Sequence, residues 1–234
     1  NHLTIEGLPL DALMAEFGSP LYVYSGTGLE RALTAFQAAV APVSGKVHFA
    51  LKANSALGVI ALLARCGAGA DIVSAGELAR ALAAGIVAKD AVFSGVGKSA
   101  ADIRAALAAG IGQINAESAE EVAQISAVAA AMGVVAPVAL RVNVDVDAGT
   151  HAKISTGQRS TKFGISTDQR EATSLYASID ADPNIKPMGL AVHIGSQICD
   201  LAPFELAYVA LLNVANGLRA NGLDVPCLDL GGGV

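Results

Sequence analysis

Cysteine is scarce in this sequence, and the few cysteines present do not form a pattern that would hold a metal. There are three in 234 residues, at Cys66, Cys199 and Cys227. They are far apart and odd in number, so they show neither a metal-ligand spacing nor a disulfide framework. Such cysteines are typical of small core residues in a reducing compartment. We therefore expect a cytoplasmic protein without a metal site.

Charge is also in short supply, and it is not arranged to bind polyanions. Charged residues make up only 15% of the chain, the formal net charge is −6, and no basic cluster occurs. These features argue against a nucleic-acid partner. No apolar run approaches the roughly 18 residues that span a bilayer, and the first residues lack the regions of a secretory signal. We expect no membrane association.

Alternating strand and helix signals are what the sequence has in abundance. Short apolar runs predict strands, and the alanine-rich segments between them predict helices. The predicted strands are 47–51, 70–73, 91–94, 113–115, 138–143, 189–194 and 227–230. The predicted helices are 56–64, 76–84, 101–109, 119–132, 168–179 and 203–220. This regular alternation favours a parallel sheet, either open or closed into a (β/α)8 barrel.

Two of the predicted helices are preceded by a serine that is followed three residues later by a glutamate. Ser74 and Glu77 form one such pair, and Ser118 and Glu121 form the other. In a capping box the serine side chain accepts from a free amide of the first turn, and the glutamate accepts from the amide of the serine. We expect both helices to begin at these serines.

Lys52 directly follows the first predicted strand, a position where lysine is unusual. Burial of an ammonium group is costly, and it lowers the pKa of a lysine and makes its amine nucleophilic. A nucleophilic amine is what a Schiff-base lysine requires. A strand-end lysine can equally extend its ammonium group to solvent, and the strand alone leaves that alternative open.

Other polar residues occupy the same end of the predicted strands. They are Asn54, Asp71, Ser74, Asn115, Glu117, Arg141, Asn143, His193, Ser196 and Asp229. Active sites of (β/α)8 barrels lie at the carboxyl ends of the strands. We therefore expect these side chains to surround one site, except Asp229, which we expect to point toward core packing or a neighbouring loop.

Three consecutive glycines, Gly231, Gly232 and Gly233, follow the last predicted strand. Their amides could approach a phosphate closely, although a tight turn explains such a run equally well. The hydroxyl of Ser196 adds a suitable donor. A lone histidine such as His193 is more often a structural residue. However, a flat imidazole beside a lysine and a phosphate-binding loop fits a planar phosphorylated aldehyde, and pyridoxal 5′-phosphate is such a molecule.

Several motifs along the chain form a set. They are Pro20-Leu-Tyr-Val-Tyr24, His48-Phe-Ala-Leu-Lys-Ala-Asn54, Asp71-Ile-Val-Ser-Ala-Gly-Glu77, Thr150-His151, Thr156-Gly157, Lys162-Phe-Gly-Ile165, His193-Ile-Gly-Ser-Gln-Ile198 and Leu228-Asp-Leu-Gly-Gly-Gly233. Together they resemble the fold-type III pyridoxal-phosphate decarboxylases, and the resemblance covers almost the whole chain. The polar stretch 145–166, taken with 193–198, resembles the diaminopimelate branch of that family.

The resemblance implies a role for each residue of the expected site. Lys52 would carry pyridoxal 5′-phosphate and His193 would stack on its ring, so these two would be the catalytic residues. The remaining cofactor-binding residues would be Ser196, Gly231, Gly232 and Gly233 at the phosphate, and Asp71 and Arg141 near the lysine and the ring.

The resemblance also implies a fold, a (β/α)8 TIM-like barrel of the alanine racemase and decarboxylase type, incomplete here with about seven strands. We expect residues 1–25 to lead into the barrel and residues 26–234 to form its cofactor-binding part, truncated before the last strand. The C-terminal β domain and the acidic partner of the pyridine nitrogen, which family members carry, would be absent. The segment alone is then expected to be inactive and to expose two sheet edges.

The activity implied by the diaminopimelate branch is decarboxylation of meso-2,6-diaminopimelate to L-lysine and CO2, the last step of lysine biosynthesis. The family's enzymes are homodimers with shared active sites. A related ornithine, arginine or carboxynorspermidine decarboxylase is one alternative, and a non-catalytic pyridoxal-phosphate-binding barrel is another. The 193–198 motif disfavours the first, and the glycine run together with the long insertion disfavours the second.

Overall fold

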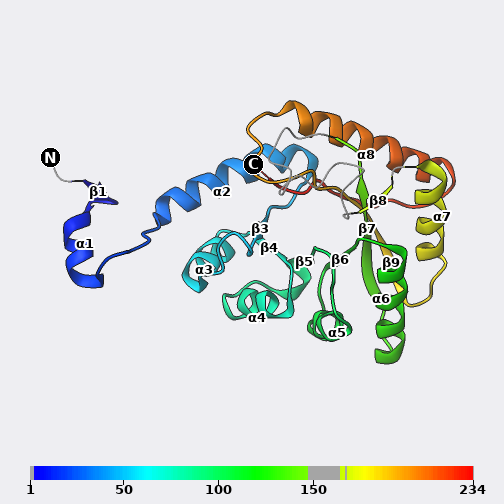
Figure 1. Cartoon of the computed structure of the whole chain (residues 1–234), viewed down its shortest axis with the longest axis horizontal. Coiled ribbons are helices and arrows are strands. Elements are labelled where there is room, and N and C mark those ends of the chain that lie inside the picture. Colours follow the sequence, from blue (N-terminus) through cyan, green and yellow to red (C-terminus); the bar gives the residue numbers. More distant parts are fainter. Residues whose placement is uncertain (1–2, 147–163, 167, 234) are drawn as a thin grey trace.

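A curled parallel sheet, lined on its outer side by helices, forms the body of the molecule (Figure 1). The computed structural model describes residues 3–146, 164–166 and 168–233. The strands of the sheet follow the order β10-β9-β7-β6-β5-β4-β3, and every neighbouring pair is parallel. They are β3 (His48–Ala50), β4 (Gly69–Ile72), β5 (Ala91–Phe93), β6 (Gln113–Ala116), β7 (Ala136–Asn143), β9 (Ile185–Ala191) and β10 (Cys227–Asp229). A short strand, β8 (Ile165–Ser166), pairs with the end of β7.

The predicted strands are all present, and only one differs from its prediction by more than about two residues at its start. That strand is β9, which begins at Ile185 instead of residue 189. Pro187 hides this start in the sequence because proline has no amide to donate to a strand ladder. The structure tolerates it next to an irregularity in the pairing with β7, between Val138 and Ala139.

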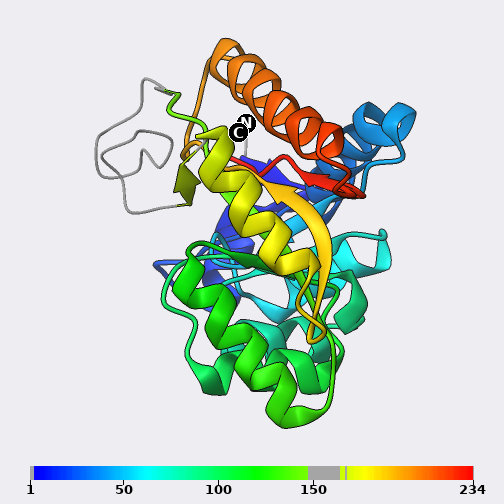
Figure 2. The same ribbon diagram turned by 90° about the vertical axis from the view of Figure 1, so that its right-hand side faces the viewer.

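Helices follow the strands in regular alternation and cover the outer face of the sheet (Figures 1 and 2). They are α2 (Gly26–Val40), α3 (Leu57–Arg65), α4 (Ala75–Ala83), α5 (Ala100–Ala109), α6 (Ala119–Met132), α7 (Gln169–Asp180) and α8 (Ala202–Ala220), with short 3-10 turns at Ala41–Val43 and Ala88–Asp90. The last six confirm the predicted helices to within about a residue. Within the described residues, no helix is both long enough and apolar enough to cross a membrane.

Helix α4 shows that the predicted capping boxes form only in part. The side chain of Ser74 accepts from the amide of Glu77, as expected. The carboxylate of Glu77, however, accepts from the amide of Val73 at 2.8 Å, one residue before the serine. The pair at 118–121 behaves in the same way. A reciprocal box forms instead at 99–102, at the start of α5.

The amino-terminal residues lie apart from the sheet (Figure 1). A hairpin of β1 (Thr4–Ile5) and β2 (Leu8–Pro9) leads into α1 (Leu10–Phe17), and α1 has no buried residue. None of these elements, nor α2, is among those predicted above. Apolar residues of α1 recur at helical spacing, at positions 10, 13, 14 and 17, yet none is buried. In α2, Leu33 is buried in a second, smaller cluster with Val59, apart from the main core.

The sheet is strongly curved, as expected for a barrel that has not closed (Figure 2). Its curvature brings β10, at one end of the strand order, back toward β6. The side-chain amide of Asn115 on β6 donates to the carboxylate of Asp229 on β10 at 2.8 Å. Seven parallel strands curled in this way confirm the predicted incomplete barrel.

The core fills the space between the sheet and its helices. Large apolar side chains from successive strands are fully buried there, among them Ile72, Phe93 and Ile114. Strand β6 is buried at all four of its positions, as expected for a parallel strand covered on both faces. The predicted motifs at 150–151, 156–157 and 162–163 lie outside the described residues.

Candidate active site

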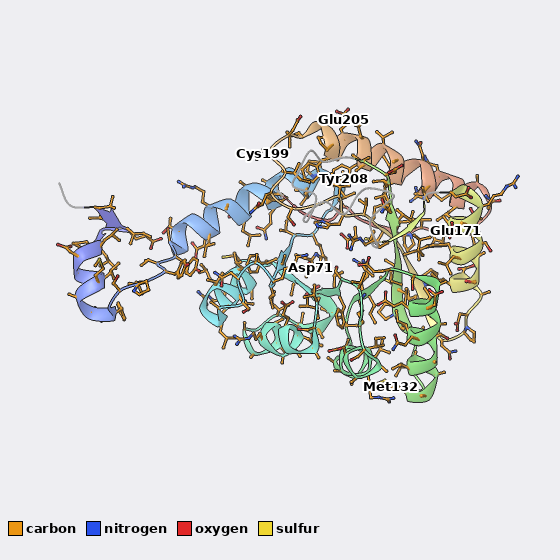
Figure 3. The ribbon with its side chains drawn as sticks, viewed as in Figure 1. Asp71, Met132, Glu171, Cys199, Glu205 and Tyr208 are labelled. Atoms are coloured by element: carbon orange, nitrogen blue, oxygen red, sulfur yellow. The ribbon has the colours of Figure 1, made fainter. Side chains whose placement is uncertain are left out.

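The predicted site residues gather at the carboxyl edge of the sheet, as the parallel topology requires. Lys52 lies in the turn directly after β3, Asp71 lies in β4, and Arg141 lies near the end of β7. His193 and Ser196 follow β9, and the three glycines follow β10. Figure 3 places Asp71 near the middle of the molecule.

Lys52 is exposed in the described structure. The described part of the chain therefore does not bury its ammonium group, in contrast to the expectation from the sequence. Its charge nevertheless acts on two of the predicted partners, since it opposes the rise in the pKa of Asp71 and adds to the fall in the pKa of His193. Lys52 thus lies in the same electrostatic environment as both.

Asp71 is a carboxylic acid whose pKa is shifted toward neutrality. Burial raises the pKa of Asp71 to about 6. The hydroxyl of Ser94, which donates to Asp71 Oδ1 at 2.5 Å, and the charge of Lys52 both oppose that rise. Near neutral pH this group therefore exists in both charge states.

His193 is a neutral imidazole at neutral pH. Burial, together with the positive charges of Arg141 and Lys52, lowers its pKa to about 4. Its Nδ1 atom accepts a long hydrogen bond from the amide of Gly232, at 3.4 Å. A nitrogen that accepts carries no proton, so the proton of the neutral ring lies on Nε2.

Arg141 is buried and fixes the backbone beside His193. Its Nη1 atom donates to Glu117 Oε1 at 2.6 Å, and Nη2 donates to the carbonyl oxygen of His193 at 3.3 Å. Glu117 also accepts from the amide of Gly164 at 3.2 Å. The ion pair therefore joins three of the loops that follow neighbouring strands.

Lys98 is a buried cation that the sequence analysis missed. Its ammonium group donates to the carbonyls of Gly95 and Asn115, at 2.5 and 2.8 Å, and to Glu121 Oε1 at 3.1 Å. Burial lowers the pKa of Lys98, and Glu121 opposes that shift. Nothing in its local sequence distinguishes it, because its partners come from residues up to 23 positions away.

A chain of polar side chains crosses the interior of the curled sheet. It runs from Asp71 through Ser94 to Asn115 and ends at Asp229. Gln113 donates to the side-chain oxygen of Asn115 at 2.8 Å, which fixes the orientation of that amide. Asp229 also accepts from the following loop, at the amide of Gly231. Asp229 thus bonds to the loop that directly follows it and to β6 across the curled sheet, so it faces the same interior as Asp71 and Asn115, and the expectation that it lies apart from them is wrong.

The glycine loop packs directly against the segment that carries His193 and Ser196. Gly231 has a φ of +70° and Gly233 a φ of +117°. A side chain at Gly231 would collide with the carbonyl oxygen of Val192, and one at Gly233 would collide with that of Gly195. Glycine is therefore required at both positions. A side chain at Gly232 would instead meet nothing within 4 Å, so the loop opens onto free space there.

These donors fit the phosphate of pyridoxal phosphate. A serine hydroxyl and closely packed backbone amides bind a phosphate without a metal. Among the described residues, no three His, Cys, Asp or Glu side chains are placed to hold a metal ion. A neutral imidazole ring and a primary amine lie at the same edge of the sheet, and they suit a planar aromatic aldehyde.

Relatives of known identity resemble this chain along nearly all of its length. It is 47% identical over 235 residues to the diaminopimelate decarboxylase of Zymomonas mobilis, covering 99% of this chain and 55% of that protein. It is 48% identical over 232 residues to the diaminopimelate decarboxylase of Pseudomonas aeruginosa, with the same coverage of both. The chain thus spans about half the length of the curated relatives it matches.

The fold agrees with this similarity. The crystal structure of diaminopimelate decarboxylase from Helicobacter pylori complexed with L-lysine superimposes with a TM-score of 0.92 at 37% identity. The match covers 96% of this chain and 57% of that one. The family model described as "Pyridoxal-dependent decarboxylase, pyridoxal binding domain" matches residues 27–234. The chain therefore belongs to the pyridoxal-dependent decarboxylase family, as its pyridoxal-binding domain, and its cofactor is pyridoxal phosphate.

Proposed function

We propose that the complete protein decarboxylates meso-2,6-diaminopimelate to L-lysine and CO2. The observation that carries this proposal is the arrangement at one sheet edge of Lys52, the neutral ring of His193 and the glycine loop. The substrate is supported by relatives at 47–48% identity that are named diaminopimelate decarboxylase. It is also supported by the H. pylori structure, which is described as complexed with L-lysine.

Each residue of this chain has a distinct task in the proposed reaction. The amine of Lys52 would bond to the aldehyde carbon of the cofactor. The hydroxyl of Ser196 and the later part of the 231–233 loop would hold its phosphate. When bound, pyridoxal phosphate supplies the electron-withdrawing ring into which the electrons of the broken carbon–carbon bond delocalise.

His193 would lie against the face of the ring and exclude water from it. Its pKa of about 4 keeps the imidazole neutral at working pH, and its Nδ1 atom faces the amide of Gly232. A neutral ring with one nitrogen already engaged is better suited to stacking than to proton donation. Arg141 would set the position of that ring through the carbonyl of His193.

Asp71 would place a negative charge near Lys52 at the cofactor site. Because the pKa of Asp71 is about 6, the carboxylate is mostly ionised at pH 7 and above. Asp71 would therefore present a carboxylate on the cofactor-facing edge of the sheet, and the charge of Lys52 favours its ionised form.

Further features of the proposal concern the protein as a whole. Residues 1–25 would lead into the barrel, and 26–234 would form its cofactor-binding part. The complete protein would be a cytoplasmic homodimer with shared active sites and no nucleic-acid partner. The net charge of −6 supports the last point. Decarboxylation of ornithine, arginine or carboxynorspermidine, and cofactor binding without catalysis, are alternatives that the names of the relatives make less favourable.

A substrate comparison tests this proposal. The complete gene product, saturated with pyridoxal phosphate, would be given meso-diaminopimelate, ornithine or arginine in parallel, and the amine product and CO2 would be measured. We expect turnover of meso-diaminopimelate to L-lysine at a rate far above the other two. Lys52→Ala should abolish it, whereas Lys89→Ala, which removes an exposed lysine at the opposite edge of the sheet, should not. Preference for ornithine or arginine would assign the protein to the other branch.

A further inference from the structure

One carboxylate, that of Asp229, bonds at the same time to the glycine loop and to the opposite wall of the barrel. Its Oδ1 atom accepts from the amide of Gly231 at 2.9 Å. Its Oδ2 atom accepts from the side-chain amide of Asn115 at 2.8 Å. Asn115 is buried, with 3% of its surface exposed, so this second contact is a fixed point in the interior.

The first contact decides which amides of the loop are available to a ligand. The amide of Gly231 is already engaged by Asp229, so it does not serve as a phosphate donor. Farther along the loop, the carbonyl oxygen of Gly233 accepts from the amide of Ile198 at 2.8 Å. The loop is thus held at both ends. Gly232, between them, donates its amide to His193 Nδ1 in a long hydrogen bond of 3.4 Å, and a side chain added there would meet open space.

A carboxylate beside a phosphate-binding loop needs a physical reason, because two negative groups repel each other. Here each oxygen of Asp229 accepts from a donor of this chain, which offsets part of its negative charge. The negative charge of Asp229 also reaches Asp71, whose pKa is raised chiefly by burial and further by Asp229. A fixed geometry of the turn is a benefit that would offset this repulsion.

We propose that Asp229 is a positioning residue that presets the 231–233 turn for the phosphate of the cofactor, with Asn115 as its anchor across the barrel. This inference rests on the proposed function, since it takes the ligand of the loop to be the phosphate of pyridoxal phosphate. In this arrangement Gly231 shapes the turn, and the later part of the loop together with Ser196 contacts the phosphate.

The test compares two ligands that differ only in the phosphate. Pyridoxal has the same ring and aldehyde as pyridoxal 5′-phosphate, so both can bond to Lys52. The dissociation constants of both would be measured by visible absorbance in the complete gene product, and thermal unfolding of each variant would be recorded. Asp229→Ala should weaken binding of pyridoxal 5′-phosphate roughly tenfold to hundredfold, because the loop loses its hydrogen bond to a charged carboxylate. Binding of pyridoxal should change by less than about threefold on the same scale.

Two further variants make the test specific. Asn115→Ala, which leaves the bond between Asp229 and Gly231 in place, should produce a smaller loss with the same dependence on the phosphate. Asp180→Ala, at an exposed carboxylate at the end of α7, should change neither constant. If Asp229→Ala does not fold, the same comparison is made with Asp229→Asn, which preserves the size of the side chain.

The outcomes separate this inference from the function on which it rests. Equal losses for both ligands would mean that Asp229 only stabilises the barrel, and unchanged constants would mean that the loop needs no such support. Either result overturns the inference while the proposed function stands. Failure of the unaltered protein to bond pyridoxal 5′-phosphate at Lys52 would instead overturn the proposed function.

Discussion

Arg141 and Glu117 form a buried ion pair in which 2.6 Å separates Nη1 from Oε1. Both residues are less than a tenth exposed. The Nη2 atom of Arg141 donates to the carbonyl oxygen of His193. The carboxylate of Glu117 also accepts from the amide of Gly164. The pair therefore connects the ends of β6 and β7 to the residue that would stack on the cofactor.

Removal of one partner of this pair should be far more damaging than loss of an exposed pair. Glu117→Ala removes the carboxylate that faces the buried guanidinium of Arg141, and loss of one partner of a buried pair typically costs about 3–5 kcal/mol. The midpoint of thermal or chemical unfolding should fall accordingly. The control is Lys46→Ala, which breaks a solvent-exposed pair with Asp90 and should cost at most about 1 kcal/mol. Similar losses of stability in both variants would contradict the burial of the pair formed by Arg141 and Glu117.

His193 should remain neutral until the solution is well into the acid range. Because its folded pKa is about 4, below the ordinary value of about 6.5, the unfolded chain takes up a proton there before the folded one does. The contribution of the neutral His193 ring to the free energy of unfolding is therefore constant above about pH 6.5, and it is lost as the pH falls from there toward 4. Imidazole resonances followed by NMR would show this directly. A midpoint near 6.5 would contradict the partly buried, cation-flanked position of the ring.

The two roles open to His193 can be separated by substitution. His193→Phe keeps a flat ring for stacking, whereas His193→Ala removes it. If stacking is the main role, the Phe variant should retain the cofactor more tightly than the Ala variant in an absorbance titration. Equal weakening in both variants would indicate that a nitrogen of the imidazole is required.

Asp71 should make stability depend on pH in the opposite sense. Burial raises its folded pKa to about 6, so its favourable contribution is complete below the unfolded value of about 4 and is lost as the pH rises through 6. Asp71→Asn keeps an oxygen that can accept from Ser94 but carries no charge. The variant should therefore gain stability relative to the unaltered protein between pH 4 and pH 7.5. If the free energies of unfolding of the two proteins differ by the same amount throughout this interval, the raised pKa of Asp71 is contradicted.

Ser196 should contribute one donor to the phosphate. Loss of a hydrogen bond to a charged group typically costs about 1.5–3 kcal/mol, so Ser196→Ala should weaken cofactor binding by roughly one to two decades. Ser178→Ala, on the exposed face of α7, is the matched control and should leave binding unchanged. An unaltered dissociation constant in Ser196→Ala would remove this serine from the site.

The sheet and its outer helices could be predicted from the sequence because their signals are local. Helix α6 begins and ends where the apolar stripe and the serine cap place it, at Ala119 and Met132. Strand β5 begins at the predicted Ala91. In both, burial imposes a pattern on neighbouring residues, and that pattern is readable without the fold.

The cross-barrel contacts could not be predicted in the same way, because their partners are distant in the sequence. Asn115 and Asp229 are 114 residues apart, and only the curvature of the sheet brings them together. Nor does the sequence reveal that the carboxylate of Glu77 accepts from the amide of Val73 instead of the amide of Ser74. The amino-terminal helix α1 has apolar residues at helical spacing, yet none of them is buried, so its sequence pattern does not indicate its exposure.

The most direct test of the account is to find which lysine carries the cofactor. The complete gene product would be incubated with pyridoxal 5′-phosphate, reduced with borohydride, digested and mapped by mass spectrometry. The account predicts a single reduced adduct on the peptide that contains Lys52, and its loss in Lys52→Ala. An adduct on another lysine that persists in Lys52→Ala would contradict the central claim.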